Sequence, residues 1–164
     1  MNIDNILSSE YTLCCAPSGS KKRVLEHLSH FIADRIESMD ADALYQQFLA
    51  RERLGSTGIG DGVAIPHCRV SGCHQITGAL LRLETPVDFD AIDDQPVDIV
   101  FALIVPEEQN DEHLKTLSAI AQMLQEGDNL AKLRSAKSNT ALYQTAIARP
   151  PSTNQQQQTI RESS

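Results

Sequence analysis

The stretch RERLGSTGIGDGVAIPHCRV, residues 51–70, contains the features on which both the fold and the chemistry of this chain depend. Four glycines fall within residues 55–62, and an apolar run, a proline and a single histidine, His67, follow them. The apolar run predicts a short buried strand that stops at Pro66, because proline has no N–H to donate to a sheet. We therefore expect His67 at a rigid strand end, where ligands of α/β sheets commonly bind.

The glycine run does not fit the common nucleotide-binding fingerprints. No Gly-Lys-Ser/Thr follows the glycines of residues 58–62, and the next element is a strand where a dinucleotide fold would have a helix. Two interpretations stay open: tight connections that need positive φ, or a pocket of amides that binds an anion with the hydroxyls of Ser56 and Thr57. His67 likewise is either a buried ring bonded to a carbonyl group or a nucleophile toward a phosphoryl group.

The sequence on either side of this stretch predicts an α/β domain over residues 1–148. Apolar residues at helical spacing predict helices over residues 20–37 and 40–55, with Ser20 and Asp40 as N-caps and Gly55 in a left-handed turn at the end of the second. Their inward faces are expected to carry Val24, Leu25, Leu28, Phe31, Ile32, Leu44, Phe48 and Leu49.

Two apolar segments that follow predict strands. Residues 76–89 read as a strand interrupted at Thr85–Pro86, because proline disrupts a sheet ladder. Residues 97–106 form an apolar run rich in β-branched residues, which predicts a central strand covered on both faces.

The last part of the domain is predicted to be helical. Residues 110–127 form an amphipathic helix with Asn110 as N-cap and Gly127 at its end, and shorter helices follow at 128–136 and 139–147. Residues 149–164, rich in proline, glutamine and serine, predict a disordered tail. The expected inward stripe of the long helix is Leu114, Leu117, Ile120, Ala121 and Leu124.

Composition excludes several classes of protein. The net charge of −8 argues against nucleic-acid binding, which needs clustered Lys and Arg. No segment approaches the ~20 apolar residues of a membrane span, and the first residues lack the features of a secretory signal. Four cysteines, two of them adjacent, suit a reducing cytoplasm. The Cys68-x4-Cys73-His74 spacing is not that of a zinc knuckle, so we expect neither a metal nor a cofactor.

A second histidine, His113, strengthens the interpretation of His67 as a nucleophile. It lies near the start of the predicted helix 110–127, whose positive end favours a neutral imidazole and supports an anion. Arg51 or Arg53, just before the glycines, is placed to neutralise phosphoryl oxygens. We expect the two histidines to meet at a solvent-accessible hollow, with one attacking and the other donating a hydrogen bond.

Three blocks, residues 51–67, 83–106 and 113–124, together resemble the nitrogen-regulatory branch of the fructose/mannitol-type IIA family of the bacterial phosphoenolpyruvate phosphotransferase system. The resemblance covers residues 1–148 and implies a IIA type-2 domain, a mixed β-sheet flanked by helices. It implies that His67 accepts the phosphoryl group and that His113 supports it through a hydrogen bond. Arg51 is implied to stabilise the phosphate. Ser56 and Thr57, in the G-S-T-G block, favour the nitrogen branch and are expected to stabilise phosphate as well.

The resemblance also implies partners. The phosphate would come from an HPr-like carrier, and the phosphorylation state would regulate targets such as potassium-transport systems or sensor kinases. Two alternatives stay open: a sugar-specific IIA component that passes phosphate to a IIB domain, and a regulatory module that only binds. Cys68 replaces a common glycine of relatives and Asp61 a common asparagine, and we expect both to tune the transfer rate.

Overall fold

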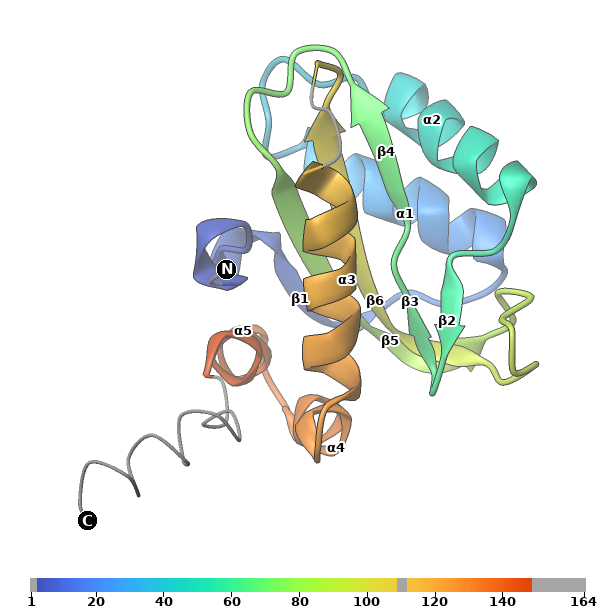
Figure 1. The fold of residues 1–164 in the computed structure, drawn as a ribbon, viewed down its shortest axis with the longest axis vertical. Coiled ribbons are helices and arrows are strands. Elements are labelled where there is room, and N and C mark those ends of the chain that lie inside the picture. The colour runs from blue at the N-terminus through green and yellow to red at the C-terminus, as the bar shows by residue number, and fades with distance from the viewer. Residues whose placement is uncertain (1–2, 109–111, 149–164) are drawn as a thin grey trace.

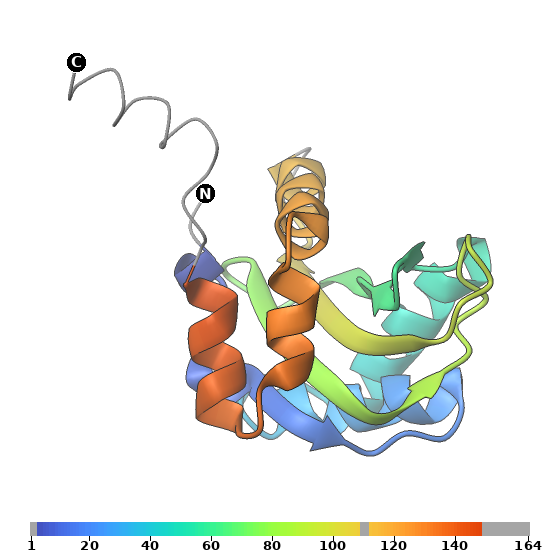
Figure 2. The ribbon, with the colours of Figure 1, turned by 90° about the horizontal axis from the view of Figure 1, so that it is seen from below.

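The chain folds into a mixed β-sheet with helices on both faces, as a computed structural model of residues 3–108 and 112–148 shows (Figures 1 and 2). The α/β class predicted from the sequence is confirmed. The strands are β1 (Thr12–Ala16), β2 (Gly58–Gly60), β3 (Val63–Ala64), β4 (His67–Val70), β5 (Thr77–Val87) and β6 (Val97–Pro106). The helices are α1 (Lys21–Ala33), α2 (Ala41–Leu54), α3 (Glu112–Gln125), α4 (Asn129–Ser135) and α5 (Asn139–Ile147), and two 3-10 turns, Ile3–Asn5 and Ser9–Tyr11, precede β1.

Two of the earlier predictions fall outside this range. The tail predicted for residues 149–164 and the N-cap predicted at Asn110 both lie outside the described residues. Within the two described ranges, the helices all lack the combination of length and apolar character needed to cross a membrane.

The first two helices begin as predicted. The side chain of Ser20 accepts a hydrogen bond from the Arg23 N–H, and Asp40 accepts one from the Ala43 N–H at 2.9 Å. Each cap satisfies one of the backbone donors that a helix start leaves unpaired. The end of α2 differs from the prediction: Gly55 has φ 154° and ψ 147°, which is not the left-handed helical turn expected there.

The sheet order is β1-β5-β6-β3-β2, and β4 also pairs with β6. The central strand β6 runs antiparallel to β5 and parallel to β3 and β4, and all its residues except Asp98 are buried, as predicted. One core lies between the sheet and helices α1 and α2, and a second lies between the sheet and helices α3, α4 and α5 (Figure 2). The sheet therefore separates two apolar layers.

The strand predicted to break at Thr85–Pro86 does not break. β5 runs through both residues to Val87. Its pairing with β1 ends at Leu83, and its register with β6 shifts between Arg82 and Val87. Pro86 therefore lies where no regular ladder requires its missing N–H.

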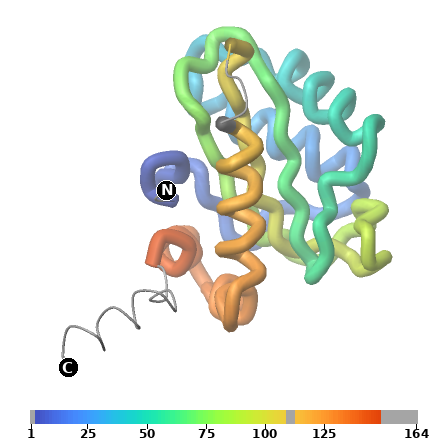
Figure 3. Tube along the Cα trace, viewed as in Figure 1, coloured from blue at the N-terminus to red at the C-terminus, as the bar shows by residue number. Residues whose placement is uncertain are grey.

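The strand that ends before Pro66 resumes directly after it. His67 is the first residue of β4, which pairs with the same strand as β3: Val63 lies opposite Ile99, and His67 opposite Leu103. Figure 3 shows the two short strands following one another along β6. The predicted strand before Pro66 is therefore present and ends at Ala64. The chain nevertheless stays on the sheet after Pro66, so His67 begins a second short strand, which the sequence did not predict.

The predicted inward stripe of α3 is correct except at its start. Ile120 and Leu124 are fully buried, whereas Leu114 is 53% exposed. Leu114 lines a surface pocket instead of the core.

The cap of α2 gives a test of local helix stability. Asp40→Ala removes the acceptor of the Ala43 N–H and should lower the free energy of unfolding by about 1 kcal/mol. Asp40→Asn keeps an oxygen acceptor and should retain most of the stability. Urea denaturation followed by circular dichroism measures both variants. Equal losses in the two would show that the side-chain hydrogen bond does not carry the effect.

Candidate active site

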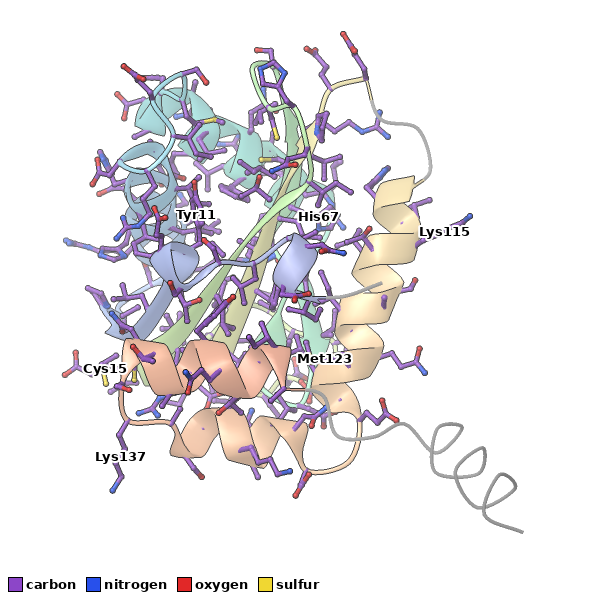
Figure 4. The ribbon with its side chains drawn as sticks, turned by 90° about the vertical axis from the view of Figure 1, so that its left-hand side faces the viewer. Tyr11, Cys15, His67, Lys115, Met123 and Lys137 are labelled. Atoms are coloured by element: carbon purple, nitrogen blue, oxygen red, sulfur yellow. The ribbon has the colours of Figure 1, made fainter. Side chains whose placement is uncertain are left out.

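A pocket of about 480 Å³ lies beside β4, between α2 and α3. It brings the two histidines to one solvent-accessible hollow, as expected from the sequence. In Figure 4, His67 lies at the same height as Lys115, a residue in the first half of α3. The side chains that matter for its chemistry are Arg51 and Leu54 from α2, His67 and Arg69 from β4, and His113 and Leu114 from α3.

Two hydrogen bonds hold the half-buried ring of His67. Its Nδ1 lies 2.8 Å from the carbonyl oxygen of Ile65, and Nε of Arg51 donates to its Nε2 at 3.2 Å. A carbonyl oxygen can only accept, and a guanidinium can only donate, so the proton of the neutral ring lies on Nδ1. Nε2 therefore carries the lone pair, which accepts the hydrogen bond from Arg51.

The surroundings of His67 favour the neutral imidazole. Burial lowers its pKa below the usual value of about 6.5, and the electrostatic influence of Arg51 and His113 lowers it further. The hydrogen bond to Ile65 and the carboxylate of Glu52 oppose this shift, but the net direction is downward. The neutral form of the ring therefore predominates at neutral pH.

Arg51 is held at the end of α2 by contacts on both sides. Its Nη1 donates to the carbonyl oxygen of Gly55 at 2.8 Å, while Nε reaches His67. Arg53, the other arginine considered from the sequence, is exposed and does not line the pocket. Of the two arginines, Arg51 is therefore the one that lies beside His67.

Glu52, the neighbour of Arg51, has a buried carboxylate that accepts hydrogen bonds from several donors. One oxygen accepts from the backbone N–H of Thr57 at 3.0 Å and from the Thr57 hydroxyl; the other accepts from Nζ of Lys21 at 3.2 Å. Lys21 also bonds the carbonyl oxygen of Phe89 and the carboxylate of Asp90. These bonds fix the end of α2, and with it Arg51, against two other segments of the chain.

Ser56 and Thr57 do not reach the pocket. The Ser56 hydroxyl donates to the carbonyl oxygen of Phe89 at 2.5 Å and accepts from the Gly58 N–H at 3.0 Å. Thr57 is buried, and both its donors serve Glu52. The structure gives the two hydroxyl groups internal partners behind the end of α2, where the sequence suggested a direct contact with an anion.

Asp61, one of the two departures from relatives, lies far from the histidines. It occupies the β2–β3 turn at φ 58°, where its side chain accepts from Gln125 at 3.2 Å and its carbonyl group accepts from Arg134. Gln125 ends α3, twelve residues beyond His113, which corresponds to about 18 Å along a helix. The charge of Asp61 therefore does not adjoin the pocket.

Cys68, the second departure, is buried in the core with α1 and α2 and also lines the pocket. Burial raises the pKa of its thiol to about 12, so it stays protonated. The Cys73 thiol donates to the carbonyl oxygen of Gln75 at 2.9 Å. Within residues 3–108 and 112–148, no group of three or more His, Cys, Asp or Glu is arranged to hold a metal ion.

Among the pocket residues that sequence reasoning missed are Arg69, Leu54 and Leu114. Arg69 follows His67 by two positions on β4, so both side chains belong to one face of the strand. Continuing the strand beyond Pro66 would have revealed this. Leu54 and Leu114 are 84% and 53% exposed, and such large apolar side chains beside reactive groups indicate a surface for a protein partner.

Comparison with known proteins identifies the family to which this chain belongs. A family model described as "Phosphoenolpyruvate-dependent sugar phosphotransferase system, EIIA 2" matches residues 5–148. The nitrogen regulatory protein of Pseudomonas aeruginosa is 47% identical over 147 residues, covering 90% of this chain and 96% of that protein. The nitrogen regulatory protein of Escherichia coli K12 is 41% identical over 145 residues, covering 88% of each chain. The crystal structure of the nitrogen regulatory protein IIA-Ntr from Neisseria meningitidis has a TM-score of 0.81 at 37% identity, covering 88% of this chain and 98% of that one.

The electrostatics of the pocket can be tested at His67. Arg51→Met removes a positive charge beside the ring, and the pKa of His67 should rise as a result. An NMR titration of the histidine ring protons measures it. Arg53→Met, which removes an exposed charge outside the pocket, is the matched control and should leave the pKa of His67 unchanged. A fall in the pKa of His67 in Arg51→Met would contradict the geometry described above.

Proposed function

We propose that this chain, which belongs to the EIIA 2 family of the phosphoenolpyruvate-dependent sugar phosphotransferase system, acts in the cytoplasm as a phosphohistidine phosphocarrier of the nitrogen-related branch. It accepts a phosphoryl group from the phosphohistidine of an HPr-like carrier. Its phosphorylation state then regulates target proteins, for which potassium-transport systems and sensor kinases are the candidates.

The observation that carries this proposal is the state of His67. Nδ1 donates a hydrogen bond to the carbonyl oxygen of Ile65, which leaves the lone pair of the ring on Nε2. The pocket that His67 lines also contains Arg51 and His113. In the transfer step Nε2 attacks the phosphorus atom in line, a new N–P bond forms, and the N–P bond of the donor breaks. The electron pair of that bond returns to the donor ring, so the step needs no oxidant, metal or added base.

Arg51, Arg69 and His113 provide the positive charge and hydrogen-bond donors for the transferred group in this proposal. Phosphorylation adds close to two negative charges to the ring and removes the lone pair to which Arg51 donates. We therefore assign Arg51 to the phosphoryl oxygens in the phosphorylated state. Thr57 acts indirectly, since its contacts with Glu52 fix the helix end that carries Arg51.

The alternative functions differ in partner or in chemistry. A sugar-specific IIA component would use the same pocket and pass phosphate to a IIB domain. The nitrogen branch is favoured because the relatives at 47% and 41% identity are nitrogen regulatory proteins. A module that only binds would leave His67 unphosphorylated, and direct assay separates this alternative from the other two.

Phosphorylation can be assayed with phosphoenolpyruvate, enzyme I and an HPr-like carrier. The wild-type chain should gain one acid-labile, base-stable phosphate, and the position of the N–P bond, read by NMR, should be Nε2. His67→Ala should abolish the gain, because the nucleophile is gone. His113→Ala should slow the transfer about 100- to 1000-fold while allowing it to finish, as for loss of a supporting donor.

An unchanged intact mass under conditions that phosphorylate a known IIA acceptor would refute the phosphocarrier proposal. His74→Ala is the matched control for loss of a histidine, because His74 is exposed and does not line this pocket. Its rate should equal that of the wild type.

Exposed leucines beside the histidines provide a test of donor docking. Leu54→Asp places a charge in the apolar border of the pocket and should raise the KM for the phosphorylated donor about tenfold, with a smaller effect on kcat. Ile92→Asp is the matched control, since Ile92 is equally exposed at 84% but does not line the pocket. Steady-state transfer rates distinguish them, and equal effects would show that Leu54 is not part of the docking surface.

A further inference from the structure

Two adjacent cysteines, Cys14 and Cys15, place their sulfur atoms 3.8 Å apart in β1. Successive side chains of a regular strand point to opposite faces, which would separate the two sulfurs. Here the register of β1 against β5 shifts between Cys14 and Ala16, and Cys15 adopts φ 61°. This bulge brings both thiols to the same side, in a conformation that is unfavourable for a residue with a Cβ atom.

The thiol pair is open to solvent on one side and held by fixed groups on the other. Cys15 is exposed, and Figure 4 shows it at the molecular edge, away from His67. The Cys14 N–H donates to Oδ1 of Asn139 at 2.7 Å, and its thiol donates to the carbonyl oxygen of Ala136 at 3.6 Å. The α4–α5 connection therefore fixes the position of Cys14.

A positive charge lies beside the exposed thiol. Nη2 of Arg82 is 3.9 Å from Sγ of Cys15, and Nη1 of the same guanidinium donates to the carbonyl oxygens of Arg134 and Ala136. The guanidinium is thus fixed by the backbone and can stabilise the Cys15 thiolate, the form of the thiol that attacks a soft ion. Electropositive, partly exposed surroundings are typical of reactive cysteines.

The pair is better suited to chelation than to a disulfide bond. Adjacent Cα atoms lie about 3.8 Å apart across a trans peptide, which is below the roughly 4.4–6.8 Å that disulfides usually span. Two sulfur donors on the same side offer a soft ion two bonds without that constraint.

We propose that Cys14 and Cys15 form a preorganised dithiol site for a soft, thiophilic ion of the trivalent arsenic class. With phenylarsine oxide as the probe, two S–H bonds break and two As–S bonds form. The oxide oxygen leaves with both protons as water. Arsenic remains trivalent throughout, so the step requires neither an oxidant nor a reductant.

Titration of the folded chain with phenylarsine oxide, followed by intact-mass analysis, tests the site. The wild type should take up one phenylarsenic group that survives excess monothiol and is released by a dithiol. Cys14→Ser and Cys15→Ser should each lose this adduct, with thermal melting to confirm that they fold. The double variant Cys68→Ser/Cys73→Ser removes the other two thiols and should retain it.

Preorganisation has its own measurement, because two neighbouring cysteines can bind arsenic even in an unfolded chain. A synthetic peptide of residues 10–20 should bind the probe at least about tenfold more weakly than the folded chain does, since it lacks the bulge and its fixed partners. Equal affinity of peptide and folded chain, or an adduct retained by Cys14→Ser and lost in Cys68→Ser/Cys73→Ser, would overturn the proposal.

Discussion

The hydrogen bond between Nδ1 of His67 and the carbonyl oxygen of Ile65 is the constraint on which the rest of the pocket depends. Because a carbonyl group cannot donate, this contact fixes the tautomer of the ring and leaves the lone pair on Nε2. It arises from the interruption at Pro66, which separates β3 from β4 and lets the Ile65 carbonyl reach the ring two residues later. Arg51 then donates to Nε2, and His113 shares the same pocket.

Local signals predicted the elements whose causes are local. The caps at Ser20 and Asp40 and the apolar run of β6 need only a few neighbouring residues to be recognised. β1 and β2 were not predicted, for different reasons. β1 exists through pairing with a strand distant in the chain, and the residues of β2 carry the signals of a turn. Thr12 lies opposite Leu80, a pairing across two helices and three short strands of the chain. β2 consists of residues 58–60, two of which are glycines that disfavour strands.

In the site, residue types predicted which groups meet in the pocket, whereas the path of the backbone decided which neighbouring residues point elsewhere. The predicted meeting of His67 and His113 is seen in the structure, and Arg51 joins them. The hydroxyl of Thr57 was expected in the pocket because it adjoins the glycines, yet the buried Glu52 carboxylate takes both its donors. Leu114 was expected in the core because its helical phase fits, yet the first turn of α3 lies over the pocket.

Hydrogen bonds of the Glu52 carboxylate connect segments that lie far apart in the chain. A short peptide cut from the site would lack some of these segments. Lys21 comes from α1, Thr57 from the segment after α2, and the Phe89 carbonyl group, through Lys21, from the loop between β5 and β6. A peptide of residues 51–70 would contain His67 and Arg51 but not Lys21 or that loop. Grafting this chemistry onto another scaffold therefore requires a lysine from a neighbouring helix, transferred together with the motif, so that a bare carboxylate is not left in the interior.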